Sequence, residues 1–354
     1  MVKSKSGDGK RKNGKEKAPP LQPEKEIVFD RKIARMNGEN QTLKKKYKIL
    51  VGQLEKVERD NEIFATLKGP LEIFKIDPKT PSGTSEATAV LVASDWHVEE
   101  KVDPATVNGK NRYNLELAKS GAEQFFTNGL RLIEIQRQAT TIKTLVLALL
   151  GDFITNSIHE ELVEINQLSP VEATLFVQKL LASGIEFLLK HGKFDEIIIP
   201  CLSGNHGRTT AKVHVSTEKG HSLEYMMYAA LAERFKNESK VKFILADGYH
   251  LYLKAHNVTM RFHHGHQVRY QGGVGGIYIP ANKAIAQWNK VKWADLDVFG
   301  HFHQCKKGGN FITNGSLIGY NAYALSIKAD YERPKQMFFL IDKKRDPTID
   351  CPIL

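Results

Sequence analysis

Asp, Asn and His residues recur at five places in this sequence, each directly after a short apolar run. The motifs are Asp95-Trp96-His97, Gly151-Asp152, Gly204-Asn205-His206, His263-His264-Gly265-His266 and Gly300-His301-Phe302-His303. Carboxylate and amide oxygens together with imidazole nitrogens suit divalent ions such as Mn, Fe, Zn and Ni. One such pair alone is typical of a surface turn with an incidental His, whereas five in the same position indicate a shared metal site.

The apolar runs before these motifs predict the elements that position them. Each run is typical of a strand buried on both faces, and the runs cover 90–93, 144–150, 197–202, 258–262 and 296–299. In open α/β sheets, ligands collect beyond the carboxyl ends of the strands. The sequence therefore predicts an α/β fold in which the five motifs meet at one edge.

The order of the motifs resembles that of the calcineurin-like metallophosphoesterase superfamily, from about Thr88 to Asp342. A further mark is the segment Thr313-Asn314-Gly315-Ser316, which is similar to the NPGS segment of that family in its last two residues. The resemblance implies a four-layer αββα sandwich of two mixed sheets. It also implies a two-metal hydrolytic centre.

Carried over residue by residue, the resemblance implies a ligand set for two divalent ions. The first ion would be held by Asp95, His97 and His303, the second by Asn205, His264 and His301, and Asp152 would bridge them. Two ions about 4 Å apart can clamp a phosphate, polarise it and generate a hydroxide at neutral pH. The oxygen and nitrogen donors suit Mn, Fe, Zn, Ni or Mg without choosing among them, and we expect Mn.

His206 resembles the residue that stands beside the metals in this family, where it protonates the leaving alkoxide or stabilises the transition state. Family members usually follow this His with Asp or Glu, which orients the imidazole, whereas this chain has Gly207. Another acid or a backbone carbonyl must then set the tautomer. Arg208 and His266 are candidates to contact substrate, and a plain surface charge is the alternative for Arg208.

Length and composition bound the class of protein. At 354 residues, the chain is long enough for one large α/β core and a smaller appendage. No apolar run reaches the ~20 residues of a membrane span, and the N-terminus is too hydrophilic for a signal peptide. Three widely spaced Cys provide neither a disulfide framework nor a thiolate zinc site. We therefore expect a cytoplasmic protein without a membrane partner.

The chain is expected to divide into four segments: a disordered basic tail at 1–26, a helical segment at 27–67, a linker with a possible strand at 68–87 and the catalytic domain at 88–354. Apolar residues in the helical segment follow the 4-3 spacing of a coiled coil, which predicts a homodimer. Alternatively, the same stripe packs against the catalytic domain. The net charge of +11 arises mostly before residue 60, so this basic arm either binds nucleic acid or keeps the protein soluble.

The remaining elements are predicted from periodicity and turn residues. Helices are expected at 113–138, at 159–191 with a break at Ser169-Pro170, and at 217–235. Strands at 241–246, 249–254 and 258–263 are expected to form an antiparallel meander, and strands at 310–314, 321–327 and 336–341 to complete the second sheet. The segment from Gln271 to Gly276 lacks the Lys-Ser/Thr pair of a P-loop and is expected to be a mobile loop.

Three functions compete on this sequence. The first is a metal-dependent phosphodiesterase acting on DNA or RNA, similar to the SbcD-like nuclease branch, with long insertions and a charged leader that resemble those of a phage enzyme. The second is a phosphatase or phosphodiesterase of nucleotides, cyclic nucleotides or phosphoproteins. The third is a catalytically dead scaffold that binds nucleic acid, which the complete ligand set disfavours.

Overall fold

The computed structural model describes residues 32, 34–39, 41, 44–46, 48, 73–81, 85–269, 276–343 and 350–353. The chain divides into two units, Met1–Leu67 and Lys68–Leu354. The described residues of the first unit are helical, and Arg35 Nε donates to Glu39 Oε1 across 3.0 Å. The basic tail, most of the expected coiled coil and nearly all of the glycine-rich segment 271–276 lie outside the described residues. The predicted homodimer therefore stays a prediction.

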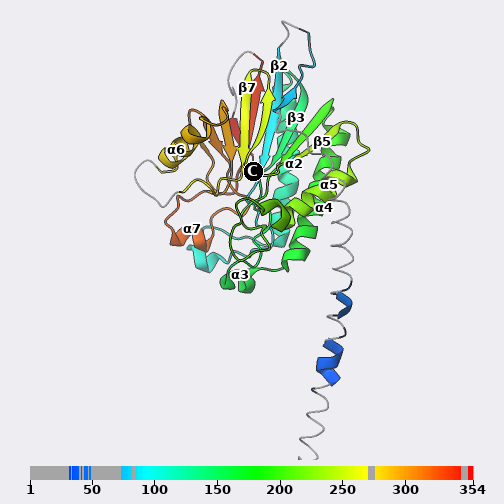
Figure 1. Ribbon diagram of the computed structural model, residues 1–354, viewed down its shortest axis with the longest axis vertical. Coiled ribbons are helices and arrows are strands. Elements are labelled where there is room, and N and C mark those ends of the chain that lie inside the picture. Colours follow the sequence, from blue (N-terminus) through cyan, green and yellow to red (C-terminus); the bar gives the residue numbers. More distant parts are fainter. Residues whose placement is uncertain are drawn as a thin grey trace, which may run out of the picture. The chain divides into compact units, whose positions relative to one another are not determined.

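The described residues of the second unit form two six-stranded mixed sheets (Figure 1). In the first sheet the order is β12 (Asp350–Ile353), β11 (Gln336–Asp342), β2 (Glu86–Ala93), β3 (Thr141–Leu149), β4 (Glu196–Cys201) and β5 (Val241–Leu245). In the second sheet it is β1 (Phe74–Ile76), β6 (Leu251–Ala255), β7 (Val258–His263), β8 (Leu296–Phe299), β10 (Phe311–Thr313) and β9 (Lys306–Lys307). Strands β2 to β5 run parallel, as do β7, β8 and β10. The motif-bearing strands therefore end at a common edge.

Alternation along the strands separates two hydrophobic cores. On β2, Val90 and Val92 belong to the core between the two sheets, which also contains Met260 and Phe262 of β7. Ala89, Leu91 and Ala93 face the opposite side, because successive side chains of a strand point to opposite faces. The prediction that this strand is buried on both faces is confirmed.

Helices complete the four layers. Helices α2 (Leu115–Gln136), α4 (Pro170–His191) and α5 (Leu223–Arg234) contribute to the core on the outer side of the first sheet. Helix α6 (Tyr278–Trp288) packs on the second sheet through Ala281 and Ile285, and Figure 1 shows it on the opposite side of the molecule from α2, α4 and α5. The predicted αββα sandwich is thus the observed architecture.

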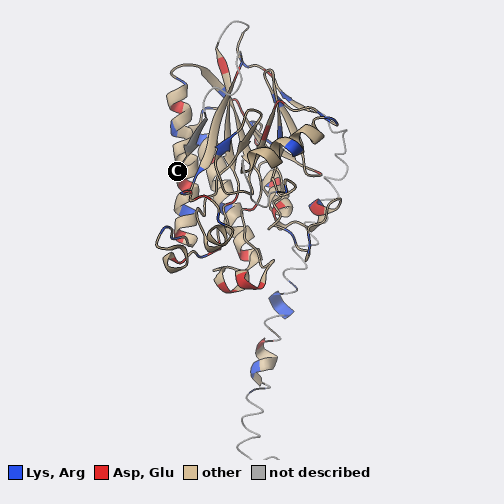
Figure 2. Ribbon diagram, turned by 90° about the vertical axis from the view of Figure 1, so that its left-hand side faces the viewer, with Lys and Arg blue, Asp and Glu red and all other residues tan. Residues whose placement is uncertain are grey.

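Capping residues explain where two long helices begin. Asn114 caps α2 by accepting from Leu117 N, and Ser169 forms a capping box with Glu172 at the start of α4. The expected break at Ser169-Pro170 is confirmed, since a short helix, α3 (Glu160–Ile165), precedes it. Acidic residues gather on α3, whereas both charge signs are interspersed over much of the second unit (Figure 2).

The expected meander is wrong. Strand β5 pairs in parallel with β4 at the edge of the first sheet, whereas β6 and β7 pair antiparallel in the second sheet. The turn around Asp247 therefore carries the chain from one sheet to the other. Strand β11 also lies in the first sheet, antiparallel to β2, and not in the second sheet as expected.

Two predicted elements differ in type or extent. Residues 321–327 are not a strand, because Asn321 accepts from Ala324 N and caps a short helix, α7 (Ala322–Ser326). The helix expected at 217–235 begins as a 3-10 turn at Glu218–His221, and α5 starts only after Ser222, whose hydroxyl caps it. Another 3-10 turn, η1 (Pro104–Val107), lies between the first motif and α2. Within the described ranges, no helix combines the length and apolar character that a membrane crossing requires.

Candidate metal centre

The structure brings all seven predicted ligands together at the carboxyl ends of five strands. Three sets of side chains have ligand atoms within 4.8 Å of one another: Asp95, His97 and His303; His97, Asp152 and His206; and Asp152, His264 and His301. Asn205 joins the last set through its Oδ1, which lies 3.2 Å from His264 Nε2. We name Asp152, Asn205, His264 and His301 the Asp152 group, and Asp95, His97 and His303 the Asp95 group. Their role as metal ligands stays a prediction.

In the Asp152 group, acceptor atoms converge on one nitrogen. His264 Nδ1 donates to the carbonyl oxygen of Leu150 across 2.7 Å, so Nε2 is the nitrogen that faces Asp152 Oδ2 at 2.9 Å and Asn205 Oδ1 at 3.2 Å. Such a set is stable only with a proton or a cation among the three atoms. The donor set therefore fits a divalent ion.

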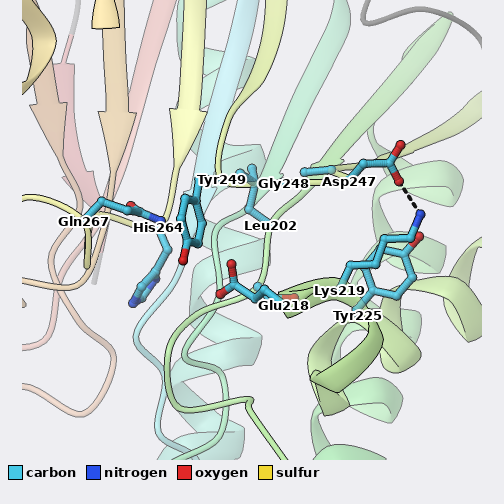
Figure 3. Close-up of a pocket in the computed structure, with 11 residues that line it drawn as sticks. Leu202, Glu218, Lys219, Tyr225, Asp247, Gly248, Tyr249, His264 and Gln267 are labelled. Atoms are coloured by element: carbon cyan, nitrogen blue, oxygen red, sulfur yellow. Dashed lines mark hydrogen bonds and ion pairs between the residues drawn. The ribbon is translucent and has the colours of Figure 1, made fainter. Parts of the chain in front are cut away.

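Electrostatics within this group point the same way. Burial lowers the pKa of His264, but the Asp152 carboxylate opposes burial and raises the pKa to about 10. Burial alone would raise the pKa of Asp152, yet His264 and neighbouring imidazoles hold it well below its usual range. His264, Tyr249 and Glu218 all line a cavity of about 10 Å³ (Figure 3). The group thus favours a cation next to Asp152.

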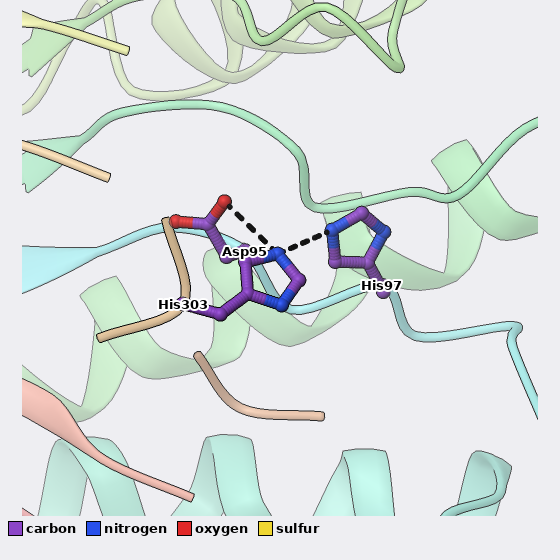
Figure 4. Close-up of side chains that lie close together, drawn as sticks. All are labelled: Asp95, His97 and His303. Carbon is purple, nitrogen blue, oxygen red and sulfur yellow. Dashed lines mark hydrogen bonds and ion pairs between the residues drawn. The ribbon is translucent and has the colours of Figure 1, made fainter. Parts of the chain in front are cut away.

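The Asp95 group has the same character (Figure 4). His97 Nε2 and His303 Nε2 lie 3.2 Å apart, and His303 Nε2 lies 3.5 Å from Asp95 Oδ1. Thr155 Oγ1 lies 3.1 Å from His97 Nδ1, and the backbone N–H of His301 donates to both carboxylate oxygens of Asp95 at 3.0 Å. The supporting atoms leave the Nε2 lone pairs and the carboxylate free to converge on an ion.

The backbone of the centre is unusual at its ligands. Asp95, His97, Asp152, His301 and His303 all have a positive φ, between 47° and 71°. A left-handed conformation costs a residue other than glycine about 1–2 kcal/mol. Such strain persists where the surrounding structure over-determines it, which is a property of functional sites.

A backbone carbonyl orients His206. Its Nδ1 lies 2.8 Å from the carbonyl oxygen of Thr155, and its backbone N–H donates to Asp152 Oδ1 across 2.8 Å. The ring meets that of His97 edge-to-face at 4.8 Å. The sequence left open whether another acid or a backbone carbonyl sets the tautomer of His206. Among the described residues, the group that contacts Nδ1 is the backbone carbonyl of Thr155.

The two predicted substrate contacts lie in different surroundings. Arg208 Nη1 donates to Asn205 O at 2.6 Å and Nε to Thr210 O at 3.2 Å. Its side chain borders a cavity of about 380 Å³ that is also lined by Asn156, Ser157, Thr209 and Thr210. His266 is largely buried against Tyr249, and its Nε2 lies 3.8 Å from Glu218 Oε1. Burial lowers the pKa of His266 to about 3 and raises that of Glu218 to about 7.

Sequence reasoning missed three buried acids that support the centre. Glu99 Oε1 accepts from the N–H groups of Thr155 and Asn156, and Glu100 accepts from Asn321. Both lie just after the first motif, where two adjacent acids at the second and third positions after His97 were the available signal. Glu224 lies on α5 and carried no sequence signal, because only the fold brings it to the centre.

Comparison with known proteins gives distant likenesses. No family model and no curated protein matches the chain. Among solved structures, the chain is similar to a dimetal phosphatase from Danio rerio, with 10% identity, a TM-score of 0.36, and coverage of 75% of this chain and 98% of that one.

Two further solved structures are similar to it. The first is Vps29 from Chaetomium thermophilum, with 8% identity, a TM-score of 0.26, and coverage of 75% of this chain and 95% of that one. The second is the sulfate thiohydrolase SoxB from Thermus thermophilus in complex with glycerol, with 8% identity, a TM-score of 0.29, and coverage of 78% and 57%. The case for a metal-dependent phosphoesterase rests on the side chains of the two groups.

Proposed function

We propose that this chain is a two-metal-dependent phosphoester hydrolase. The observation that carries the proposal is the position of Asp152, which lies within ligand distance of His97 on one side and of His264 and His301 on the other. A carboxylate shared between two sets of imidazoles suits a pair of divalent ions. Two such ions, when bound, would clamp a phosphate and lower the pKa of a water molecule.

The residues of the chain have separate tasks in this proposal. The Asp95 group holds one ion, the Asp152 group holds the other, and the mixture of oxygen and nitrogen donors suits Mn, with Fe, Zn, Ni or Mg as alternatives. His206 stands beside both groups with Nδ1 bound to Thr155 O, so that Nε2 is the nitrogen that delivers a proton to the leaving oxygen.

For the substrate, we propose a phosphodiester of DNA or RNA. Three features support it: the net charge of +11, its concentration in the basic arm, and the guanidinium of Arg208, which contacts the backbone of Asn205. The arm would attract a polyanion through counterion release. Arg208, fixed by two backbone carbonyls, would contact the phosphate next to the scissile one.

A nucleotide-sized substrate is the second candidate. The cavity beside Arg208 measures about 380 Å³, which is at the small end of the range of small-molecule sites. A single nucleotide could occupy it without any contribution from the basic arm. The two candidates therefore differ in whether residues 1–60 affect turnover.

The test is a panel of substrates with the Mn-loaded full-length protein. Single- and double-stranded DNA and RNA are compared with p-nitrophenyl phosphate and its bis-ester, using the wild type, Asp152→Asn, and Asp195→Asn as a control on an exposed acid that pairs with Lys143. We expect cleavage of nucleic acid by the wild type and the control, and its loss in Asp152→Asn.

Each other outcome selects among the alternatives. Turnover of the small esters alone, unaffected by deletion of residues 1–60, would favour the nucleotide substrate. Inertness toward every ester, with fewer than one ion bound per chain after Mn loading, would overturn the hydrolase and favour a scaffold.

A further inference from the structure

A buried carboxyl on α5 contacts two of the motif loops. Glu224 is 0% exposed, and its Oε1 accepts from Phe153 N across 2.6 Å while its Oε2 accepts from Gly204 N across 2.7 Å. Phe153 directly follows Asp152, and Gly204 directly precedes Asn205. One side chain therefore ties together the loops that present two members of the Asp152 group.

Gly207 leaves the space that this carboxyl occupies. A Cβ atom at residue 207 would lie 2.8 Å from Glu224 Cγ, 2.9 Å from Oε2 and 3.0 Å from Cδ. The φ of Gly207 is not positive, so the glycine is required here by the close approach of Glu224. The carboxyl of Glu224 thus lies where the side chain of residue 207 would otherwise project.

The start of α5 is attached to the same loop by further contacts. Leu223 N donates to Gly207 O across 2.8 Å, and the Ser222 hydroxyl donates to Ser203 Oγ across 2.9 Å. These contacts fix the position from which Glu224 reaches the loops. The loops themselves are in close contact, because a Cβ on Gly204 would lie 2.0 Å from Asp152 Oδ1.

We propose that Glu224 is a positioning residue for the metal centre, whose carboxyl reaches from α5 into the space beside Gly207 and holds the two loops that carry Asp152 and Asn205. The proposal rests on the proposed two-metal function. Glu224 does not touch the reacting atoms in this scheme. It acts by fixing the spacing between Asp152 and Asn205, and hence the geometry offered to the second ion.

The experiment tests whether a carboxyl placed on residue 207 can replace that of Glu224. The variants are Glu224→Ala, Glu224→Gln, and Glu224→Ala combined with Gly207→Asp or with Gly207→Glu, and the control is Glu233→Ala, an exposed position on the same helix. Mn affinity of the metal-free protein is measured by calorimetry, unfolding in chelator by circular dichroism, and kcat and KM with the bis-p-nitrophenyl ester.

We expect Glu224→Ala to weaken binding of one of two Mn ions by about 10- to 100-fold, the usual effect of losing a residue that supports a metal ligand. At a fixed Mn concentration, kcat should fall more than KM changes. At least one double variant should recover Mn affinity to within a few-fold of the wild type. The control Glu233→Ala should bind Mn as tightly as the wild type. Should Glu224→Ala fail to fold, Glu224→Gln, which keeps one acceptor oxygen, replaces it and should show the weaker affinity.

A merely structural role gives a different pattern. If Glu224 were merely structural, Glu224→Ala would lower the stability of the protein in chelator but leave its Mn affinity unchanged. The double variants would then show no gain in Mn affinity over Glu224→Ala. That result overturns the proposal. Failure of the proposed function is seen separately, because a wild type that binds no pair of ions, or binds them and hydrolyses no ester, is identified before any variant is made.

Discussion

The Nδ1 atom of His206 donates to the carbonyl oxygen of Thr155 across 2.8 Å. A carbonyl oxygen only accepts, so Nδ1 carries the proton in the neutral ring and Nε2 is the nitrogen that can gain and lose one. Thr155 follows Asp152 by three residues, so one loop positions both the shared carboxylate and the candidate acid. In the proposed mechanism, proton delivery by His206 and metal binding by Asp152 would therefore depend on the same loop.

Replacing His206 should affect catalysis according to the leaving group. For His206→Ala, we expect kcat to fall about 10²- to 10⁴-fold with an alkyl diester, since general acid catalysis contributes that much. The loss should be much smaller with a p-nitrophenyl ester, whose leaving group needs no proton. Steady-state kinetics with both esters test this, with the exposed His191→Ala as control. Equal losses with both esters would show that His206 acts by another means.

Replacing Arg208 should separate diesters from monoesters. A lost hydrogen bond to a charged group costs about 1.5–3 kcal/mol, so Arg208→Ala should raise KM for a dinucleotide about 10- to 100-fold. KM for p-nitrophenyl phosphate should change little. Arg208→Lys should not restore binding, because an ammonium lacks the planar fork. A parallel loss of Mn affinity would instead mean that Arg208 serves to hold Asn205, whose carbonyl it contacts.

The buried Glu99 should make stability depend on pH. Burial raises its pKa from 4.5 to about 7, although two N–H groups donate to Oε1, and Oε2 has no partner among the described residues. Because the folded pKa exceeds the unfolded one, the folded protein binds the extra proton between these values, and stability falls as pH rises through that window.

Glu99→Gln removes this dependence while keeping the accepting oxygen. At about 1.4 kcal/mol per unit of pKa, the variant should gain up to about 3 kcal/mol over the wild type at pH 8 and little at pH 4.5. Urea unfolding in chelator at both pH values measures the difference. If the unfolding free energies of the two proteins changed in parallel with pH, the raised pKa of Glu99 would be contradicted.

The buried ion pair in the second sheet should matter for stability alone. Arg261 Nε and Nη2 donate to the two oxygens of Asp297 at 2.7 and 2.9 Å, and both residues are fully buried. Asp297→Asn leaves a guanidinium without a compensating charge, which should cost about 3–5 kcal/mol. Asp195→Asn, on an exposed pair with Lys143, should cost less than about 1 kcal/mol. Denaturant titration measures the unfolding free energy of both variants. Equal losses of unfolding free energy in the two variants would refute the expectation.

The strands that end at the centre could be predicted because their signal is local. The run 90–93 is apolar on both faces, and parallel strands present their carboxyl ends at one edge, so the positions of Asp95 and Asp152 follow from pattern alone. His263, the last residue of β7, stacks on Phe299 at 4.6 Å. That position, too, is set by the alternation of its own strand.

What could not be predicted depends on contacts between distant segments. Strands β5 and β6 are consecutive and equally apolar, yet they join different sheets, because membership is decided by the partner strand and not by the strand itself. Residues 321–327 form a short, largely apolar run like a strand, but Tyr323 and Ile327 are exposed and the Asn321 cap makes a helix. Glu224 is a single acid on a helix, and its two acceptor contacts exist only after folding.

The left-handed backbone at Asp95, His97, Asp152, His301 and His303 has an evolutionary consequence. Glycine and asparagine tolerate that conformation best, so a selection for heat tolerance in a metal-free medium should enrich them at these five codons. Sequencing the survivors would map the centre without any assay of catalysis. A lineage that kept Asp and His there through such a regime would reveal a continuing demand for bound ions.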